Sequence, residues 1–309
     1  MEKASRIYVA GHKGLVGSSL VRTLQAKGYT NIVTTTRKEV DLTNPGLVDA
    51  WFNAYKPEYV FDCAAKVGGI YANATFPAEF IYDNLQIQNN LIDSAHRHNA
   101  KKFMFLGSVC IYPKYAETPV KEETLLTGEL EPTNQWYAVA KIAGIKMCQA
   151  YRKQYGKDFV SVMPCNLYGV NDNFHPTNSH VIPALIRKFV EAKTNKAEYV
   201  ECWGTGMARR EFLYVDDMTD ALEFLMNNYS DMEIINIGCG YDVTIAELVV
   251  MIAKLVDFKG KIMWDHTKPD GTPKRMLDTT KLFNLGWKPK ISLEEGLTRS
   301  IEWFKVNVK

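Results

Sequence analysis

The stretch RIYVAGHKGLVGSSLVRTLQAKG, residues 6–28, decides the fold. Residues 6–10 form a short apolar run, and residues 15–27 repeat apolar side chains at helical spacing. In a strand–turn–helix context, spaced glycines permit a tight turn, let backbone approach a pyrophosphate and let helix and strand pack closely. The helix then turns free N–H groups toward negative charge. The stretch predicts a dinucleotide site, with a plain β–α turn as the alternative, and its glycines are Gly11, Gly14 and Gly17.

Strand and helix patterns alternate through the first half of the chain. Such alternation is typical of a parallel, doubly wound α/β sheet with helices on both faces, the Rossmann arrangement. We therefore predict a nucleotide-binding domain over residues 1–165. Its further strands are expected at residues 31–36, 58–65, 102–106 and 158–164, and its further helices at residues 79–98 and 137–155.

The texture changes after Pro164. Residues 168–179 are rich in Asn, Pro and Gly and read as a loop. We predict a second, smaller α/β domain for substrate, mainly residues 166–309, with segments of about residues 211–240 returning to the first domain. Its helices are expected at residues 179–192, 216–227, 243–256 and 292–306, and its strands at residues 199–203 and 234–237.

Composition narrows the function classes. Of 309 residues, 46% are hydrophobic and 23% charged, which is ordinary for a globular chain. A net charge of +2 with scattered basic residues gives no case for a nucleic-acid partner. No apolar run reaches the roughly 18 residues of a membrane span. The six cysteines form no C-x-x-C pair, so we expect no metal site and a reducing, cytoplasmic location.

The end of the second strand bears on the choice between NAD and NADP. An acidic residue there would hold a ribose 2′-hydroxyl, whereas Arg37 and Lys38 follow Thr36 in this chain. A guanidinium suits a 2′-phosphate through charge-assisted hydrogen bonds. The pattern favours NADP(H), although a solvated basic turn is the alternative and one residue of slip would bring Glu39 near the ribose.

Tyr137 and Lys141 stand four residues apart on one predicted helix, and hence on one face. A nearby ammonium stabilises phenolate, lowers the phenol pKa and so suits proton transfer to a carbonyl during hydride transfer. Ser108 follows the fourth strand, where ligand-contacting groups collect in open α/β sheets. Taken alone, the pair fits an ordinary amphipathic helix and the serine a turn.

Together these features resemble the extended short-chain dehydrogenase/reductase family and, within it, the GDP-L-fucose synthases. The resemblance extends over nearly the whole chain and is more specific than the glycine motif. The stretches that carry it are VAGHKGLVGSSLVR (9–22), AAKVGGI (64–70), GSVCIYP (107–113), EPTNQWYAVAKIAGIKMC (131–148), NLYGVNDNFHPTNSHVIPALIRKF (166–189), WGTGMARREFLYVDDM (203–218) and KPDGTPKRMLD (268–278).

The resemblance implies NADPH-dependent 3,5-epimerisation and 4-reduction of GDP-4-keto-6-deoxy-D-mannose to GDP-L-fucose. Cys110 and His180 match the family's acid–base pair for epimerisation. Tyr137, Lys141 and Ser108 match its groups for ketone reduction. From the residues alone, Cys110 would read as a small buried residue and His180 as a polar residue at a helix start.

The resemblance also implies binding residues and a homodimer through the two helices at 79–98 and 137–155. The substrate residues implied are Lys188, Trp203, Arg210 and Asp270, with the choice between Arg209 and Arg210 left open. The cofactor residues implied are Gly11, His12, Lys13, Gly14, Leu15, Val16, Gly17, Arg37, Asp41, Leu42, Ala64, Ala65, Leu106, Gly107, Ser108, Tyr137, Lys141, Pro164, Asn166, Leu167 and His180.

Two rivals and three departures accompany this hypothesis. A GDP-L-colitose synthase, which epimerises only C5, would keep the same catalytic groups. A non-catalytic NADP-sensing or scaffold protein would need neither acid–base pair. The departures from the family pattern are Val109, Cys165 and the pair Val170–Asn171.

Overall fold

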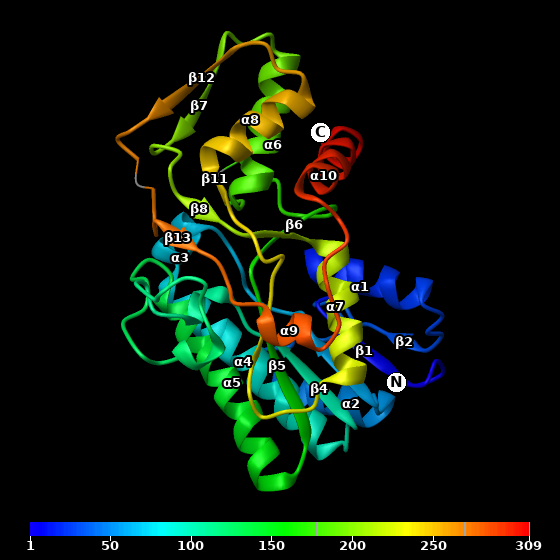
Figure 1. Ribbon diagram of the computed structural model, residues 1–309. Coiled ribbons are helices and arrows are strands. Elements are labelled where there is room, and N and C mark those ends of the chain that lie inside the picture. The colour runs from blue at the N-terminus through cyan, green and yellow to red at the C-terminus, as the bar shows by residue number, and fades with distance from the viewer. Residues whose placement is uncertain (177, 269, 309) are drawn as a thin grey trace.

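A parallel sheet forms the centre of the computed structural model, which describes residues 1–176, 178–268 and 270–308. Within these residues the sheet has six strands in the order β10-β5-β4-β3-β1-β2 (Figure 1). The order runs outward in both directions from the neighbouring strands β1 and β3, as in a doubly wound sheet, so the predicted fold class is confirmed. The strands are β1 (Ile7–Ala10), β2 (Ile32–Val33), β3 (Tyr59–Asp62), β4 (Lys102–Leu106), β5 (Asp158–Pro164) and β10 (Ile235–Ile237).

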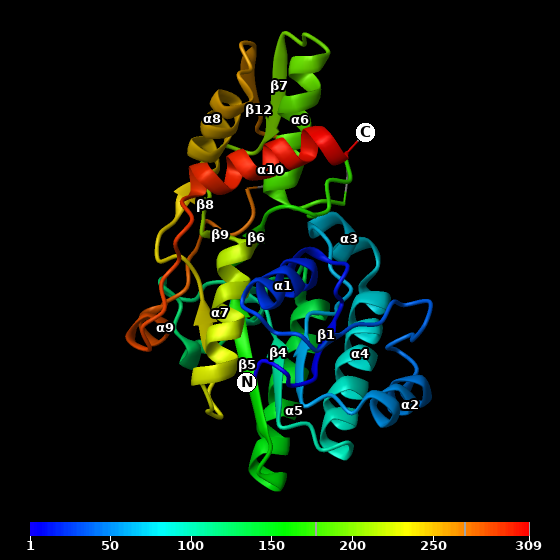
Figure 2. The ribbon, with the colours of Figure 1, turned by 90° about the vertical axis from the view of Figure 1, so that its right-hand side faces the viewer.

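Helices cover both faces of this sheet (Figures 1 and 2). On one face α1 (Leu15–Ala26) packs against α7 (Val215–Asn228). On the other, α4 (Pro77–Arg97) packs against α5 (Gln135–Tyr155) and α2 (Pro45–Tyr55). The strands between them are almost fully buried and apolar, as expected for a parallel sheet covered on both sides.

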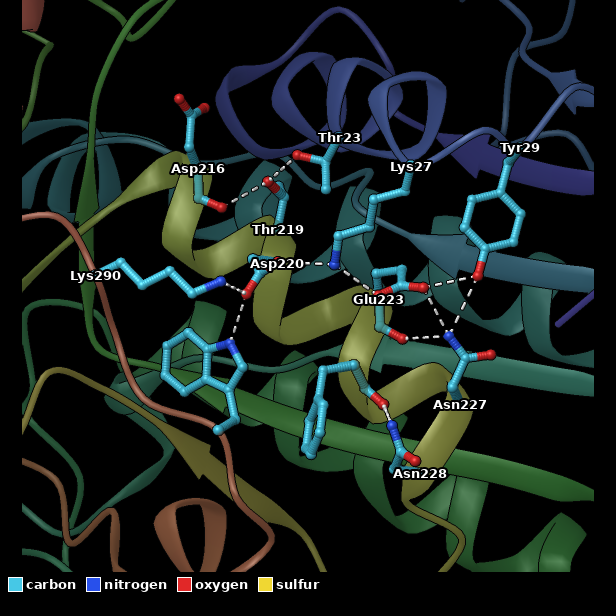
Figure 3. Close-up of polar contacts among 12 residues, drawn as sticks. Thr23, Lys27, Tyr29, Asp216, Thr219, Asp220, Glu223, Asn227, Asn228 and Lys290 are labelled. Carbon is cyan, nitrogen blue, oxygen red and sulfur yellow. Dashed lines mark hydrogen bonds and ion pairs between the residues drawn. The ribbon is translucent and has the colours of Figure 1, made fainter. Parts of the chain in front are cut away.

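The contact between α1 and α7 is polar (Figure 3). The Lys27 ammonium lies 2.7 Å from the Asp220 carboxylate and 2.7 Å from the Glu223 carboxylate. The Tyr29 hydroxyl donates to the other Glu223 oxygen at 2.7 Å, and Thr23 hydrogen-bonds Thr219 at 2.8 Å. These bonds fix α7, which comes from the second half of the chain, onto the first sheet.

A second hydrophobic cluster lies beyond the carboxyl ends of the sheet strands (Figure 1). It is built around α6 (Val181–Thr194), α8 (Ile245–Val256) and α10 (Leu293–Asn307), which pack against one another. Four strand pairings accompany it: β7 (Tyr199–Trp203) with β12 (Lys261–Asp265), β6 (Asn166–Tyr168) with β9 (Phe212–Tyr214), and β8 (Arg209–Arg210) with both β11 (Val243–Thr244) and β13 (Lys274–Arg275).

Residues 212–237 run back to the first sheet, where β10 pairs with β5. The domain boundary at residue 165 stays a prediction. None of the described helices combines the length and apolar character that crossing a bilayer requires.

The structure corrects several expected elements. The second strand covers only Ile32–Val33 instead of residues 31–36, and α2 was not expected at all. Asn44 caps α2 by accepting the N–H groups of Gly46 and Leu47, and Pro45 opens the helix, which is a start signal that the sequence contains. The other short elements that were not expected are α3 (Ile70–Thr75), α9 (Thr280–Asn284), β6, β8, β9, β11, β12 and β13.

Candidate active site

The glycine turn between β1 and α1 has the shape of a phosphate cradle. Gly11 adopts a φ of +75°, and a Cβ there would lie 2.7 Å from the Cys63 carbonyl oxygen. A Cβ on Gly17 would collide with the Gly11 carbonyl group, whereas a Cβ on Gly14 would meet only the Gly11 oxygen, at 3.5 Å. Gly14 caps α1 without any side-chain hydrogen bond, so the helix N-terminus is open to an anion.

The segment after β2 presents an exposed cation beside this turn. The Arg37 side chain is 80% exposed and lies 3.8 Å from the Asp41 carboxylate. The Glu39 carboxylate accepts the Thr36 N–H at 2.7 Å and the Thr36 hydroxyl at 2.8 Å. Because Glu39 bonds to its own turn, Arg37 is the side chain available to a 2′-phosphate, which favours NADP over NAD.

The loop after β6 reaches the same turn. The Asn171 side-chain amide donates to the Lys13 carbonyl oxygen at 2.9 Å and to the Ser18 hydroxyl at 3.1 Å. Asn171 was noted in the sequence only as a departure from the family pattern. The structure shows that it ties the loop to the glycine turn.

Three candidate catalytic groups meet where β4 ends. Ser108 accepts the Cys110 backbone N–H at 3.3 Å, and its hydroxyl also hydrogen-bonds the Tyr137 phenol. All three side chains are half-buried, so they line a surface that a substrate can reach. Burial and the neighbouring Cys110 thiol raise the pKa of Tyr137. The expected lowering of this pKa is therefore wrong, and the phenol holds its proton, as a proton donor must.

Lys141 lies beneath this group. Its ammonium donates to the Leu106 carbonyl oxygen at 2.8 Å and stands 5.9 Å from the centre of the Tyr137 ring. Burial lowers the pKa of Lys141, and the nearby Asp62 carboxylate opposes that change.

Two neighbours of Cys110 were missed in the sequence. The Asn134 side-chain amide donates to the Cys110 sulfur at 3.3 Å. The buried Arg275 guanidinium donates to the Pro113 carbonyl oxygen at 3.0 Å and acts electrostatically on the thiol. Burial raises the pKa of Cys110, while Ser108 and Arg275 lower it. Asn134 and Arg275 lie within motifs of the family resemblance, but only folding brings them to the sulfur.

His180 comes from a different element. It is the N-terminal cap residue of α6, and it is exposed. The protein around it still disfavours the charged ring and lowers its pKa. A Cβ on Gly69, in the loop after β3, would lie 3.0 Å from the Ser179 oxygen, so that loop touches the segment just before His180. Among the described residues, no hydrogen bond joins His180 to Cys110.

The four candidate substrate residues lie in the second half of the chain. The Lys188 ammonium stands 5.3 Å from the centre of the Trp203 ring, whose side chain is 62% exposed. Asp270 accepts the Thr205 N–H at 2.7 Å and acts electrostatically on Arg210. The exposed aromatic face and nearby cations suit a base and a diphosphate.

The pair Arg209–Arg210 separates into two roles. The Arg209 guanidinium lies 2.6 Å from the Asp242 carboxylate. Arg210 donates only to the Arg209 carbonyl oxygen, at 2.8 Å, among the described residues, so Arg210 is the guanidinium free for a phosphate.

Most of the remaining candidate cofactor residues lie at the carboxyl ends of the sheet strands. Leu42 accepts a hydrogen bond from Asn90 at 2.9 Å, and Asn166 donates to the Glu211 carbonyl oxygen at 2.9 Å. Carboxyl ends of parallel strands are where open α/β sheets bind ligands. The candidate cofactor residues at or just after the carboxyl ends of β3, β4 and β5 are Ala64, Ala65, Leu106, Gly107, Pro164, Asn166 and Leu167.

Comparison with known proteins places this geometry in a family. A model described as the NAD dependent epimerase/dehydratase family matches residues 7–238. The chain belongs to this family. The predicted family resemblance and enzyme class are thereby confirmed.

Named relatives match over the whole chain. A putative GDP-L-fucose synthase 2 from Arabidopsis thaliana is 59% identical, covering 100% of this chain and 94% of the relative. A GDP-L-fucose synthase from Escherichia coli is 50% identical, covering 98% and 97%. A solved GDP-D-glycero-L-gluco-heptose synthase from Campylobacter jejuni, in the presence of NADPH, superposes with a TM-score of 0.93 at 39% identity and covers 99% of both chains. A GDP-L-colitose synthase from Yersinia pseudotuberculosis is 39% identical over 97% of each chain.

Proposed function

We propose that this chain is an NADPH-dependent enzyme that converts GDP-4-keto-6-deoxy-D-mannose to GDP-L-fucose by 3,5-epimerisation and 4-reduction. The observation that carries the proposal is the meeting of Ser108, Cys110 and Tyr137 at the carboxyl end of β4, with a phosphate cradle on the same sheet edge. The named relatives support the substrate, because those called GDP-L-fucose synthase, at 59% and 50% identity, are more similar to this chain than the GDP-L-colitose synthase at 39%.

The chain's own residues fit NADP(H). Gly14 and the open N-terminus of α1 would hold the pyrophosphate, and Arg37 the 2′-phosphate. Lys141 would hold the nicotinamide ribose. When bound, NADPH supplies the hydride for C4 of the sugar.

Cys110 would remove a proton from C3 or C5 of the sugar, and His180 would return one to the same carbon. The C4 ketone makes the C3 and C5 protons of the sugar acidic, so a thiolate removes one and an enolate forms. Asn134 donates to the sulfur and Arg275 provides positive charge, both of which stabilise a thiolate. A proton returned to the opposite face by His180 inverts the carbon.

Tyr137 would then give its phenolic proton to the C4 oxygen as hydride arrives at carbon. Ser108 orients the carbonyl oxygen through its hydroxyl. The phenolate left behind is balanced by the Lys141 ammonium until a proton from solvent restores the phenol.

Two finer points remain proposals of the same kind. We propose a homodimer formed through α4 and α5, which pack against each other along one side of the sheet. We also propose a cytoplasmic location, since the six cysteines are free thiols in the structure.

The test supplies GDP-4-keto-6-deoxy-D-mannose and NADPH and follows NADPH oxidation, with the sugar product assigned by NMR. In deuterated water, Tyr137→Phe is expected to lose reduction by roughly 100- to 10,000-fold while solvent deuterium still enters C3 and C5. Cys110→Ser is expected to lose that exchange, and Cys202→Ser, which alters a buried thiol in β7, to keep it.

Absence of NADPH oxidation with this ketone would overturn the proposed substrate. Reaction with the 3-deoxy ketone alone, or deuterium at C5 alone, would assign the colitose pathway instead. NADPH binding that is unaccompanied by exchange or reduction would assign a sensing role.

A further inference from the structure

One buried carboxylate near the site has no part in the mechanism above. Asp62, the last residue of β3, is completely buried. One of its carboxylate oxygens accepts the Ala64 N–H at 3.2 Å. The other oxygen has no hydrogen-bond partner among the described residues. A buried carboxylate that is only half satisfied is costly, so its presence calls for a role.

The strand register places Asp62 on the same face of the sheet as Lys141. Asp62 stands opposite Phe105 of β4, and side chains at paired positions of parallel strands point to the same face. The Lys141 ammonium lies 4.6 Å from the centre of the Phe105 ring, so it approaches that face. Asp62 and the ammonium are therefore on one side of the sheet, below Tyr137.

Their electrostatics agree with this placement. Burial raises the pKa of Asp62 to about 6, and the Lys141 ammonium opposes the rise. Burial lowers the pKa of Lys141, and Asp62 is the strongest of the charges that oppose this. The other titratable groups that interact with the pair are Tyr8 from β1, Cys63 after β3, and Tyr137 and Cys148 from α5.

We propose that Asp62 is a positioning residue for the reduction: its carboxylate keeps the buried Lys141 protonated, so that a cation is present when Tyr137 becomes phenolate. This inference rests on the proposed function. Asp62 transfers no proton itself. Its negative charge balances Lys141 before the reaction, and the phenolate joins the same three-charge group once the phenolic proton has moved to the sugar oxygen.

The competing explanation is structural. Asp62 also holds the Ala64 N–H and so shapes the turn that leads from β3 to the cofactor side of the sheet. Asp62→Asn separates the two explanations, because the amide keeps an oxygen for the Ala64 N–H and removes the charge. Asp217→Asn is the matched control: Asp217 is buried on α7 and accepts the N–H groups of Lys290 and Ile291, away from the site.

The experiment measures kcat for NADPH oxidation against pH in the wild type and both variants. Without the carboxylate, Lys141 loses its proton at lower pH, so the basic limb of the Asp62→Asn profile is expected to move down by about one unit, which is about tenfold in kcat on that limb. The difference is expected only above pH about 6, where Asp62 carries its charge. Solvent exchange at C3 and C5 and the KM for NADPH are expected to stay unchanged.

A second readout needs no substrate. Lysine selectively labelled with carbon-13, assigned through Lys141→Arg, reports the titration of Lys141 by NMR in the whole protein. A lower titration midpoint in Asp62→Asn than in the wild type supports the proposal even if the proposed substrate proves wrong. Equal midpoints, or a raised KM for NADPH with an unmoved basic limb, would overturn it in favour of the structural explanation.

Discussion

Lys27 and Lys141 are two lysines beside acidic groups, and the structure treats them in opposite ways. Lys27, between α1 and α7, touches two carboxylates at 2.7 Å each; although partial burial would lower its pKa, these bonds raise it. Lys141, under the candidate site, donates to a backbone oxygen, and burial lowers its pKa despite Asp62. Direct carboxylate contact makes a charge structural, whereas a charge held near an acid without that contact is available to a reaction.

The same contrast recurs in two adjacent arginines. Arg209 is bound by Asp242, and Arg210, next along β8, is bound by no carboxylate among the described side chains. A guanidinium without a carboxylate keeps its attraction for an external anion. Arg209 is thus neutralised by its carboxylate neighbour, and Arg210, like Lys141, stands at the proposed site without a bonded carboxylate.

The largest expected effect follows from removing the available lysine. Lys141→Met is expected to lower kcat for reduction by roughly 100- to 10,000-fold, because the phenolate of Tyr137 then forms without a cation. The substitution also leaves Asp62 buried without an opposite charge, at a cost of roughly 3 kcal/mol in the free energy of unfolding. Urea denaturation measures the second effect. Adding Asp62→Asn to Lys141→Met is expected to restore stability but not activity. Recovery of activity as well would show that the Lys141 charge is structural, like that of Lys27.

The arginine pair gives an intermediate effect. Arg210→Gln is expected to raise KM for the GDP-sugar about 10- to 100-fold, since hydrogen bonds to charged groups contribute about 1.5–3 kcal/mol. Arg209→Gln is expected to leave KM unchanged, because its guanidinium is already bound to Asp242. Steady-state kinetics of the two variants measure both KM values. Equal KM values would mean that Arg209 and Arg210 do not differ in binding the GDP-sugar.

The smallest expected effect concerns the structural lysine. Lys27→Met is expected to lower the free energy of unfolding by about 1 kcal/mol, since its partly exposed ion pairs are screened by solvent, and to leave kcat unchanged. Burial alone would raise the pKa values of Asp220 and Glu223, which are ordinarily 3.8 and 4.5. The bonds to Lys27 outweigh burial and help to lower both values. Their contribution is present above the ordinary values and is lost as pH falls through the lowered ones.

Unfolding measured between pH 7 and pH 3 checks this. The wild type is expected to lose more stability than Lys27→Met over that range, because the variant has already lost the bonds that acid breaks. Parallel curves would mean that the α1–α7 network contributes nothing to acid stability.

Much of the sheet followed from local pattern. The strands at 102–106 and 158–164 lie where their apolar runs predict them, because a continuous apolar run buried on both faces is a local signal. The strand at 199–203 also lies where it was predicted, and its side chains alternate between exposed and buried. β8, β11 and β13, of two residues each, exist only through pairing with distant strands, and no run of two residues carries such a signal.

The candidate site divides in the same way. Gly11 is recognisable from the glycine spacing between a strand and a helix, and Tyr137 and Lys141 are recognisable because their helix follows that turn and the strand that ends before Ser108. Asn134 and Arg275 beside Cys110 are not, since the Arg275 contact joins β13 to a turn 162 positions earlier. The downward pKa expected for Tyr137 was wrong because burial, which local spacing does not reveal, raises it together with the nearby Cys110 and Asp62.

The amino-acid order by itself determined the glycine turn, the parallel sheet and the placing of Tyr137 and Lys141 on one helix, since these depend on residue type and short-range periodicity. Tertiary structure alone decided which charges are neutralised: Lys27 and Arg209 by direct carboxylate contact, Lys141 and Arg210 not. Burial and partner distance set the energy of a charge, and both arise only when segments far apart in the chain are packed together.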